Sequence, residues 1–404
     1  MLGTYMTRDR LLLLLLFVSV WINYMDRGNL SVAAPVLGPE LGLDASQMGL
    51  LLSSFFWTYS LLQPAAGWVV DRFNVYRVYA VGFAIWSVAV IFGGGAHSLT
   101  PLLLSRLMLG AGESVAYPAY SRILTAGFPE HRRGLANALV DVGTKAGPAL
   151  GIWVGGMLVA SVGWRWFFFG MGAISLIWIA PWLAVTRGVA SVREESANVS
   201  LGRILSKRQP WLTFGGLFGF NYAWYFLLTW LPSYLTRERH FTIREMAVAG
   251  AFPFAVTAVS AVLTGWYCDR LIARGASASR VRKGFAITGL LVCAATLPLV
   301  ASAEIGVALV CLGVAFAGIG LFTANCWAMT QRMAGVAAAR RWTGLQNAVG
   351  NMGGVAAPLI TGATLERTGS FGIAFLTASG MLILAGGFYL VLGKVEAVEW
   401  ENGD

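Results

Sequence analysis

The sequence has few charged residues, few cysteines and few histidines, and each shortage excludes a class of protein. Only 12% of its 404 residues are charged, whereas a soluble domain uses about 25% to coat its surface. A water-soluble globular protein is therefore excluded. The four cysteines show no metal-ligand spacing, so neither a metal site nor a disulfide is supported. The three histidines are scattered along the chain and form no His–Glu or Cys–His cluster, which argues against an enzyme.

Hydrophobic residues make up 57% of the chain and recur in runs long enough to cross a bilayer. A bilayer core about 30 Å thick takes about 20 apolar residues per helix. On this basis we predict an all-α membrane protein with twelve transmembrane helices. The predicted spans are 11–36, 47–70, 76–96, 101–126, 134–160, 165–186, 211–234, 246–271, 283–302, 305–331, 341–364 and 370–393.

The net charge of +10 comes mainly from loops on one side of the predicted membrane. If the N-terminus is cytoplasmic, twenty-one of the 29 basic residues lie in loops on that side and five on the other. The positive-inside rule then places both termini in the cytoplasm of a bacterial-type inner membrane. It also explains the basic composition without a nucleic-acid partner, so membrane lipid and a small solute are the expected partners of a chain that works as a monomer.

The longest polar stretch divides the predicted spans into two sets of six. We expect an N-terminal six-helix bundle at 1–186, a cytoplasmic linker at 187–210 and a C-terminal six-helix bundle at 211–404. Two such bundles in transporters are related by an axis along the membrane normal, with the substrate path between them.

A loop motif recurs at equivalent places in the two halves. The pattern G-W-x-x-D-R follows the second and the eighth span, and its key residues are Gly67, Asp71, Arg72, Gly265, Asp269 and Arg270. A small glycine lets helices approach closely, and an aspartate beside arginine can form a charge-assisted latch to a neighbouring helix. A simple cytoplasmic turn explains one copy but is a weak explanation for two copies in register.

This paired motif resembles the signature loop of the major facilitator superfamily. The stretch N-Y-M-D-R-G-N-L-S-V-A-A-P at 23–35 is similar to the first-helix motif of its anion:cation symporter family, and 163–168, 230–235 and 350–354 are similar to further stretches of it. The resemblance implies the major facilitator fold and alternating access. It also implies import of sugar acids such as galactonate, glucarate or hexuronates together with protons.

Six charged residues lie well inside predicted spans, away from the span ends, independently of any family. Each would cost roughly 2.5–3.5 kcal/mol at the centre of a lipid-facing helix, so all should face the protein interior or a water-filled cavity. They are Asp26, Arg27, Arg106, Glu113, Asp141 and Lys145.

The spacing of these charges leaves functional and structural interpretations open. Arg106 and Glu113 are seven residues apart and share one face of a helix, where they could form a site or a structural pair. Asp26 and Arg27 point about 100° apart, so one can face a cavity while the other meets a neighbouring helix. Asp141 and Lys145 stand at i and i+4, and a structural ion pair explains them as well as a site does.

In the functional interpretation the acids carry protons and the arginines bind an anion. A carboxylate removed from water is protonated more easily, while arginine stays charged and presents a fork that matches a substrate carboxylate. The resemblance implies proton coupling at Asp26 and Glu113 and substrate binding at Arg27 and Arg106. It also implies pocket positions, which are Tyr59, Thr144 and Lys145.

The C-terminal half has no charge at membrane depth but offers amides to a hydroxylated substrate. We select Asn221, Asn325 and Asn351 as substrate-binding residues, and the resemblance favours Asn351 most. Amides in membrane helices also hold helices together, so each has a structural alternative.

Together these features predict a secondary transporter that imports an organic anion by proton symport, with a sugar acid (a hexonate, aldarate or hexuronate) as the expected substrate. No cofactor is expected besides the coupling ion, and sodium remains open in place of protons. The alternatives are an importer of another small carboxylate, such as a tartrate-like or aromatic acid, and a proton-coupled drug exporter. The exporter is disfavoured because buried basic residues would repel a cation. A membrane enzyme or a sensor lacks any supporting motif.

Overall fold

The computed structural model describes residues 2–127, 130–189 and 199–400, with side chains except at 2–7, 9, 125–142, 145 and 336. Within these ranges the chain forms thirteen α-helices and no strand, which confirms the all-α fold predicted from composition. The helices are α1 (Leu2–Glu40), α2 (Ala45–Arg72), α3 (Val75–Gly94), α4 (Leu99–Glu113), α5 (Ala116–Gly127), α6 (Glu130–Val162), α7 (Trp164–Thr186), α8 (Leu201–Leu205), α9 (Arg208–Arg237), α10 (Ile243–Ala273), α11 (Ala278–Ser302), α12 (Ile305–Thr368) and α13 (Gly372–Val391).

Most predicted spans coincide with one helix, and three places differ. The predicted span at 101–126 is split into α4 and α5, because Pro118 has no N–H and its ring displaces the carbonyl of Ser114, four residues earlier. The helix α12 contains two predicted spans and is broken at Gly335, whose φ of 62° suits glycine. The short helix α8 lies inside the predicted linker, where Ser200 caps it.

Seven helical segments of the described residues are long and apolar enough to cross a membrane by themselves. They are Arg10–Glu40, Val75–Gly94, Trp164–Thr186, Ile243–Ala273, Ala278–Ser302, Ile305–Gly335 and Gly372–Val391. The other predicted spans are helical too. These helices (α2, α4 with α5, α6, α9 and the second part of α12) carry most of the predicted site residues. Helices α4 and α5 are each too short to cross a membrane alone, and the described part of α6 contains a shorter apolar segment, Ala146–Val162.

The chain divides into two compact units. Unit 1 consists of Met1–Glu194 with Leu228–Ala251, and unit 2 of Glu195–Leu227 with Phe252–Asp404. The predicted division at 187–210 stays a prediction, since the contacts assign the end of α9 and the start of α10 to unit 1.

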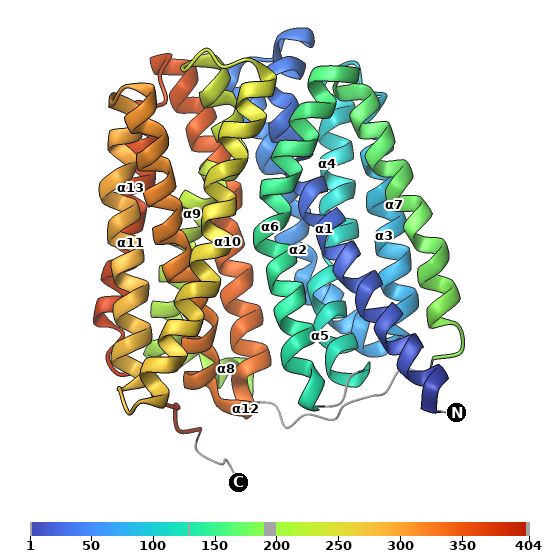
Figure 1. Ribbon diagram of the computed structural model, residues 1–404, viewed down its shortest axis with the longest axis vertical. Helices are drawn as coiled ribbons and strands as arrows, with labels where there is room; N and C mark the ends of the chain where they lie inside the picture. The colour runs from blue at the N-terminus through green and yellow to red at the C-terminus, as the bar shows by residue number, and fades with distance from the viewer. Residues whose placement is uncertain (1, 128–129, 190–198, 401–404) are drawn as a thin grey trace. The chain divides into compact units, whose positions relative to one another are not determined.

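In unit 1, α1 packs along α6 and α3 along α7, as Figure 1 shows. Glycine allows α4 to approach α3 closely, because a Cβ at Gly112 would lie 2.8 Å from the carbonyl oxygen of Gly82. The α3–α7 contact is filled by aromatic rings. Phe83 stacks on Trp178 with ring centroids 4.1 Å apart, and Trp178 stacks on Trp182 at 5.0 Å. Stacked aromatic rings therefore fill the space between α3 and α7.

In unit 2, α11 packs against α12 and α13. Its closest approach to α12 is at a pair of glycines, where a Cβ on Gly318 would lie 2.5 Å from the carbonyl oxygen of Gly289. The α10–α12 contact is closed by Phe254 and Phe316, whose ring centroids are 4.8 Å apart. Small residues thus set the helix spacing and aromatic rings fill the remaining volume.

The glycine contact in unit 2 gives a stability test. We expect Gly318→Ala to lower the melting temperature of the detergent-purified protein, because the added methyl group forces α11 and α12 apart at a cost of about 1–3 kcal/mol. Gly380→Ala on α13 is the matched control, since a Cβ there meets no atom within 4 Å. Equal melting temperatures for the two variants would contradict the glycine contact.

Candidate functional site

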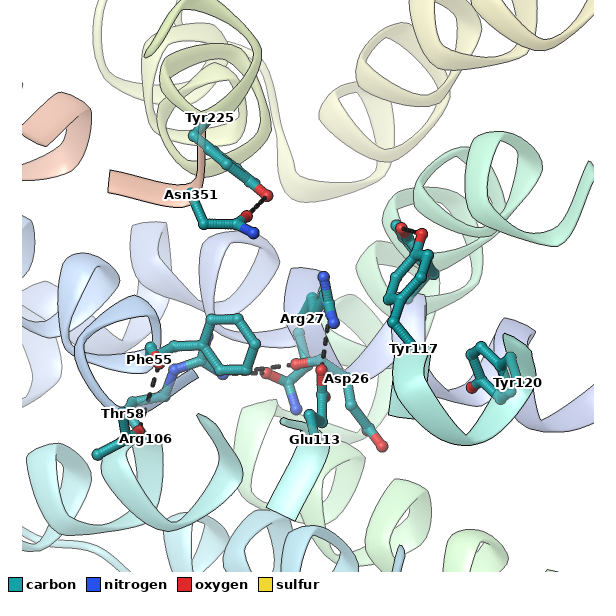
Figure 2. A network of polar contacts seen from close by, with 12 residues as sticks. Asp26, Arg27, Phe55, Thr58, Arg106, Glu113, Tyr117, Tyr120, Tyr225 and Asn351 are labelled. Carbon is teal, nitrogen blue, oxygen red and sulfur yellow. Dashed lines mark hydrogen bonds and ion pairs between the residues drawn. The ribbon is translucent and has the colours of Figure 1, made fainter. Parts of the chain in front are cut away.

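The centre of the site is an ion pair buried in unit 1. Arg27 of α1 donates from Nε to Oε2 of Glu113 at 2.7 Å, and Figure 2 shows the two side chains pointing toward one another. Glu113 is fully buried, and only 8% of Arg27 is exposed. Desolvation makes such a pair sensitive to the loss of either partner. Arg27 and Glu113 therefore face the protein interior, as their cost in lipid requires.

Aromatic rings surround the guanidinium group of Arg27. Its central carbon lies 4.4 Å from the ring centroid of Tyr59, 5.1 Å from that of Tyr24 and 5.3 Å from that of Phe55. Cation–π attraction at these distances holds the arginine in place without neutralising its charge. Tyr59, predicted as a pocket residue, is placed directly against Arg27, and its contact with a substrate stays a prediction.

Arg106 lies on the other side of Phe55. Its guanidinium carbon is also 5.3 Å from the Phe55 ring centroid, and its Nη1 donates to Oδ1 of Asn29 at 3.3 Å and to the backbone carbonyl of Asp26 at 3.4 Å. Among the described side chains it forms no ion pair within 4 Å. Glu113, its neighbour on the same helix face, pairs with Arg27 instead. A buried arginine held only by neutral oxygens keeps its positive charge available for an anion.

Asp26 is fully buried but meets no ionic partner at contact distance. Neither of its carboxylate oxygens has a hydrogen-bond partner among the described residues, and the same holds for Oε1 of Glu113. The Ser175 hydroxyl of α7 is the polar group beside it. Buried polar atoms are almost always bonded, so an exception requires a functional explanation.

A helix break places Glu113 where it can reach α1. Glu113 is the last residue of α4, and α5 begins at Ala116 after the turn that Pro118 imposes. About one and a half turns before Glu113, the hydroxyl of Thr58 on α2 donates to the carbonyl of Leu107 on α4 at 2.7 Å. This hydrogen bond holds α4 against α2. The carboxylate of Glu113 thus projects from the end of α4, which is held by α2 at Leu107 and by α3 at Gly112.

In unit 2 the favoured amide is already engaged within the unit. The hydroxyl of Tyr225 donates to Oδ1 of Asn351 at 2.6 Å, and Nδ2 of Asn351 donates to the carbonyl of Asn347 at 2.8 Å (Figure 2). Asn221 is buried on the adjacent helix, α9, next to Gly350. A substrate hydroxyl at Asn351 would therefore meet a Tyr225–Asn351 pair rather than an isolated amide.

Asn325 lies apart from this pair. Its Nδ2 donates to the carbonyl of Leu321 at 3.0 Å, and its Oδ1 accepts from Arg282 at 3.5 Å. Arg282 in turn donates to Asp269 at 2.7 Å, so Asn325 belongs to the latch at the end of α10. The structure thus supports a structural role for Asn325, and its binding role stays a prediction.

The repeated loop motif forms a latch in each unit. Asp71 pairs with Arg122 of α5 at 3.5 Å, and Asp269 pairs with Arg282 of α11 at 2.7 Å. Arg72 and Arg270 are both exposed, and the guanidinium carbon of Arg270 lies 5.3 Å from the ring centroid of Trp266. The glycines of the motif behave differently from our expectation: a Cβ at Gly67 or Gly265 would meet no atom within 4 Å, so no close helix approach is seen at either.

The predicted cluster on α6 is described only in part. Thr144 is half-buried on α6 near the face that packs on α1, where a Cβ at Gly147 would lie 2.6 Å from Cβ of Tyr24. The side chains of Asp141 and Lys145 lie outside the described residues. Both interpretations of that pair therefore stay predictions.

Sequence reasoning missed several polar and aromatic residues around the four charges. Asn23 and Asn29 flank Asp26 on α1, and Tyr24 donates to or accepts from Tyr117 of α5 at 2.6 Å. Their signal was present in the first-helix motif, where asparagines stand three residues before and three residues after Asp26. The helical period brings Asn23, but not Arg27, onto the face of Asp26.

The chain is similar to known membrane transporters. Residues 16–358 match the family described as Major Facilitator Superfamily. The chain is 31% identical to a D-galactonate transporter of Escherichia coli O6:H1 over 97% of each protein. It is 28% identical to the hexuronate transporter of Bacillus subtilis, covering 98% of this chain and 99% of that protein. A probable sulfoacetate transporter of Cupriavidus necator is 30% identical, with 90% and 88% covered.

Solved structures show the same fold. A bacterial homolog of the human lysosomal transporter Spinster, in an inward-facing and occupied conformation, has a TM-score of 0.80 at 18% identity and covers 94% of this chain and 96% of its own. The fold and the resemblance predicted from the loop and first-helix motifs are both confirmed.

The buried ion pair gives a double-mutant test. We expect Arg27→Met and Glu113→Leu each to lower the melting temperature strongly, because leaving one buried charge without its partner costs about 3–5 kcal/mol. The double variant should recover much of this loss, since neither charge remains. Thermal unfolding of the four purified proteins measures the coupling. Strictly additive losses would show that the two side chains do not depend on each other.

Proposed function

The chain belongs to the Major Facilitator Superfamily, and we propose that it is a secondary active transporter that imports an organic anion together with protons by alternating access. The family and the similar proteins are transporters, not enzymes. The observation that carries the proposal is the buried pair of Arg27 and Glu113, in which one arginine is held by an acid that a proton can neutralise.

Proton and anion binding are linked through Arg27 in this proposal. While Glu113 is ionised, it occupies the Nε side of the guanidinium group. A proton on Glu113 removes the charge that competes with a substrate carboxylate, and the fork of Arg27 can then bind that carboxylate. Linkage is reciprocal, so a bound anion in turn favours the protonated form of Glu113. Cotransport follows from competition for one guanidinium group.

Asp26 and Arg106 provide a second acid and a second cation within the same unit. Asp26 is buried without a hydrogen-bond partner among the described residues, which makes its ionised form costly. Arg106 is the cation that acts on it. We assign proton uptake to both acids and anion binding to both arginines.

A sugar acid is the substrate class that the comparisons favour. Similar proteins include transporters of D-galactonate and hexuronate and a probable transporter of galactarate and D-glucarate. A sugar acid offers a carboxylate to the arginines and a hydroxyl to Tyr59, all within unit 1. Other small carboxylates and sulfonates remain second candidates, because a guanidinium group binds either anion. A cationic drug is disfavoured by the buried Arg27 and Arg106.

The setting of this transport follows from the membrane helices. The family and the apolar helices make the chain a multi-pass membrane protein. We propose an inner-membrane monomer with both termini in the cytoplasm, as the distribution of loop arginines and lysines indicates. Protons rather than sodium are the proposed coupling ion, because the free oxygens of Asp26 and Glu113 are close to two arginines that repel a metal cation.

Uptake in proteoliposomes tests the coupling. We expect an inward acid gradient to increase uptake of the transported anion several-fold in the wild type and not in Glu113→Gln, which keeps a hydrogen-bond acceptor for Arg27 but cannot release a proton. The panel contains galactonate, glucarate, glucuronate, tartrate and sulfoacetate. Glu304→Gln, an exposed residue in unit 2, is the control. An identical response to the gradient in Glu113→Gln and the wild type would remove Glu113 from the coupling role.

Ligand-induced stabilisation tests the anion site. A ligand that binds only the folded protein stabilises it by about 2.7 kcal/mol at one hundred times its Kd, so the substrate should raise the melting temperature measurably. We expect Arg106→Gln to lose most of this shift at the same ligand concentration. Arg274→Gln, whose side chain is exposed, should keep it. An unchanged shift in Arg106→Gln would show that the anion binds elsewhere.

A further inference from the structure

The segment that follows α13 lies against α11 and α12 of unit 2. Residues 393–400, which we call the strap, have no helical or strand structure. Lys283 of α11 donates to the carbonyl of Gly393 at 3.1 Å, where the strap begins. Val395 is fully buried, and its N–H donates to the hydroxyl of Ser279 on α11 at 2.8 Å. The first half of the strap is therefore held on α11.

The second half of the strap meets α12 at the point where that helix breaks. The N–H of Val398 donates to the carbonyl of Met333 at 2.8 Å, and the indole N–H of Trp400 donates to the carbonyl of Ala334 at 2.9 Å. Both carbonyls stand directly before Gly335, the residue with non-helical φ and ψ. A helix that ends leaves its last carbonyls without partners in the helix. The strap thus donates to two carbonyls at the end of the first arm of α12, residues 305–334.

Trp400 also contacts the second arm of α12, which follows the break. Its ring centroid lies 6.1 Å from that of Trp342 in an edge-to-face arrangement. Trp342 is fully buried, and its indole N–H donates to the hydroxyl of Thr213 on α9 at 2.9 Å. The two arms also meet directly, because Thr330 donates from its hydroxyl to Oε1 of Gln346 at 2.7 Å. One strap residue therefore bonds to the first arm and packs on the second.

The break itself is the place where the two arms can change their angle most easily. Glycine tolerates a wide range of φ and ψ, so a rotation at Gly335 costs little. A Cβ at Gly335 would meet no atom within 4 Å, so close packing does not fix the break. The strap spans it with a short segment that has no regular structure and that can detach without unfolding a helix.

We propose that the strap is a clamp that fixes the angle between the two arms of α12 and releases when the cytoplasmic end of unit 2 changes shape during transport. The role in transport rests on the proposed alternating access, whereas the clamp itself does not. Basic residues beside the break place it at the cytoplasmic end in the proposed topology, and they are Arg332, Arg340 and Arg341.

The position of the strap separates its role from anion binding. Trp342 is nine residues before Asn351, which corresponds to about 14 Å along the helix. The proposed anion partners Arg27 and Arg106 belong to unit 1, whereas the strap belongs to unit 2. We therefore expect the strap to control the rate of the conformational change and not the affinity for the anion.

Amide hydrogen exchange measures the clamp without any transport. We expect Trp400→Ala to speed exchange of the amides at 331–342 by about fivefold or more, because it removes a hydrogen bond and a ring contact. Trp400→Phe keeps a ring against Trp342 but loses the N–H, so its exchange should be intermediate. Val398→Pro removes the N–H that donates to Met333 and should also speed exchange. Wild-type exchange in both Trp400→Ala and Val398→Pro would overturn the clamp.

Exchange of labelled for unlabelled galactonate in proteoliposomes measures the role in transport. We expect Trp400→Ala to raise this rate several-fold, while the rise in melting temperature caused by a fixed concentration of galactonate stays at the wild-type value. Trp211→Ala is the matched control, because the Trp211 indole N–H also donates to a carbonyl, that of Leu205 at 2.8 Å, but outside α12. It should change neither quantity.

The two measurements separate the possible failures. An anion-exchange rate that is unchanged or slower in Trp400→Ala, together with faster amide exchange, would overturn control of the rate and leave the strap a helix cap. A smaller ligand-induced melting shift in Trp400→Ala would also overturn it, since the strap would then act on anion binding. If no anion of the panel moves through the wild type, the proposed transport fails, and amide exchange still decides whether the clamp exists.

Discussion

The structure of unit 1 depends on one buried ion pair, Arg27 with Glu113. Two charges removed from water stabilise the fold only when they meet at short distance, because each alone carries a large desolvation cost. The 2.7 Å contact therefore requires α1 and α4 to be held in a fixed relation. Close contacts at two glycines hold these helices in place: Gly112 of α4 packs on α3, and Gly147 of α6 packs on α1. The break between α4 and α5 lets the carboxylate of Glu113 project toward α1.

The same pair explains why the neighbouring aromatic residues are needed. The rings of Tyr24, Phe55 and Tyr59 exclude water from the guanidinium group and still attract its charge. Carboxylates in their place would neutralise Arg27 permanently. An arginine held by rings and by one protonatable acid can change partners, which is the physical requirement for coupling a proton to an anion.

The helices and the depth of the charges could be predicted from sequence, but the partners could not. Apolar runs locate the spans because a helix in lipid needs apolar side chains. The free-energy cost of placing a charge in lipid indicates that Asp26, Arg27, Arg106 and Glu113 face inward. Arg27 and Glu113 are 86 residues apart, and their pairing depends on helix rotation that no local pattern encodes. The amides show the same limit: Asn351 is bonded to Tyr225 and Asn325 lies at the Asp269 latch, because the neighbour that reaches an amide decides its role.

The two units differ in the kind of polar group that they bury. In the described part of unit 2 every buried polar side chain is uncharged, whereas unit 1 buries Arg122 at its latch and, in and beside its ion pair, two acids and two arginines. These four charges sum to zero when all are ionised. An anion alone would leave this site negative and a proton alone would leave it positive, and either net charge is costly at low dielectric. Binding both restores neutrality, so the balance of charges in unit 1 by itself favours moving proton and anion together.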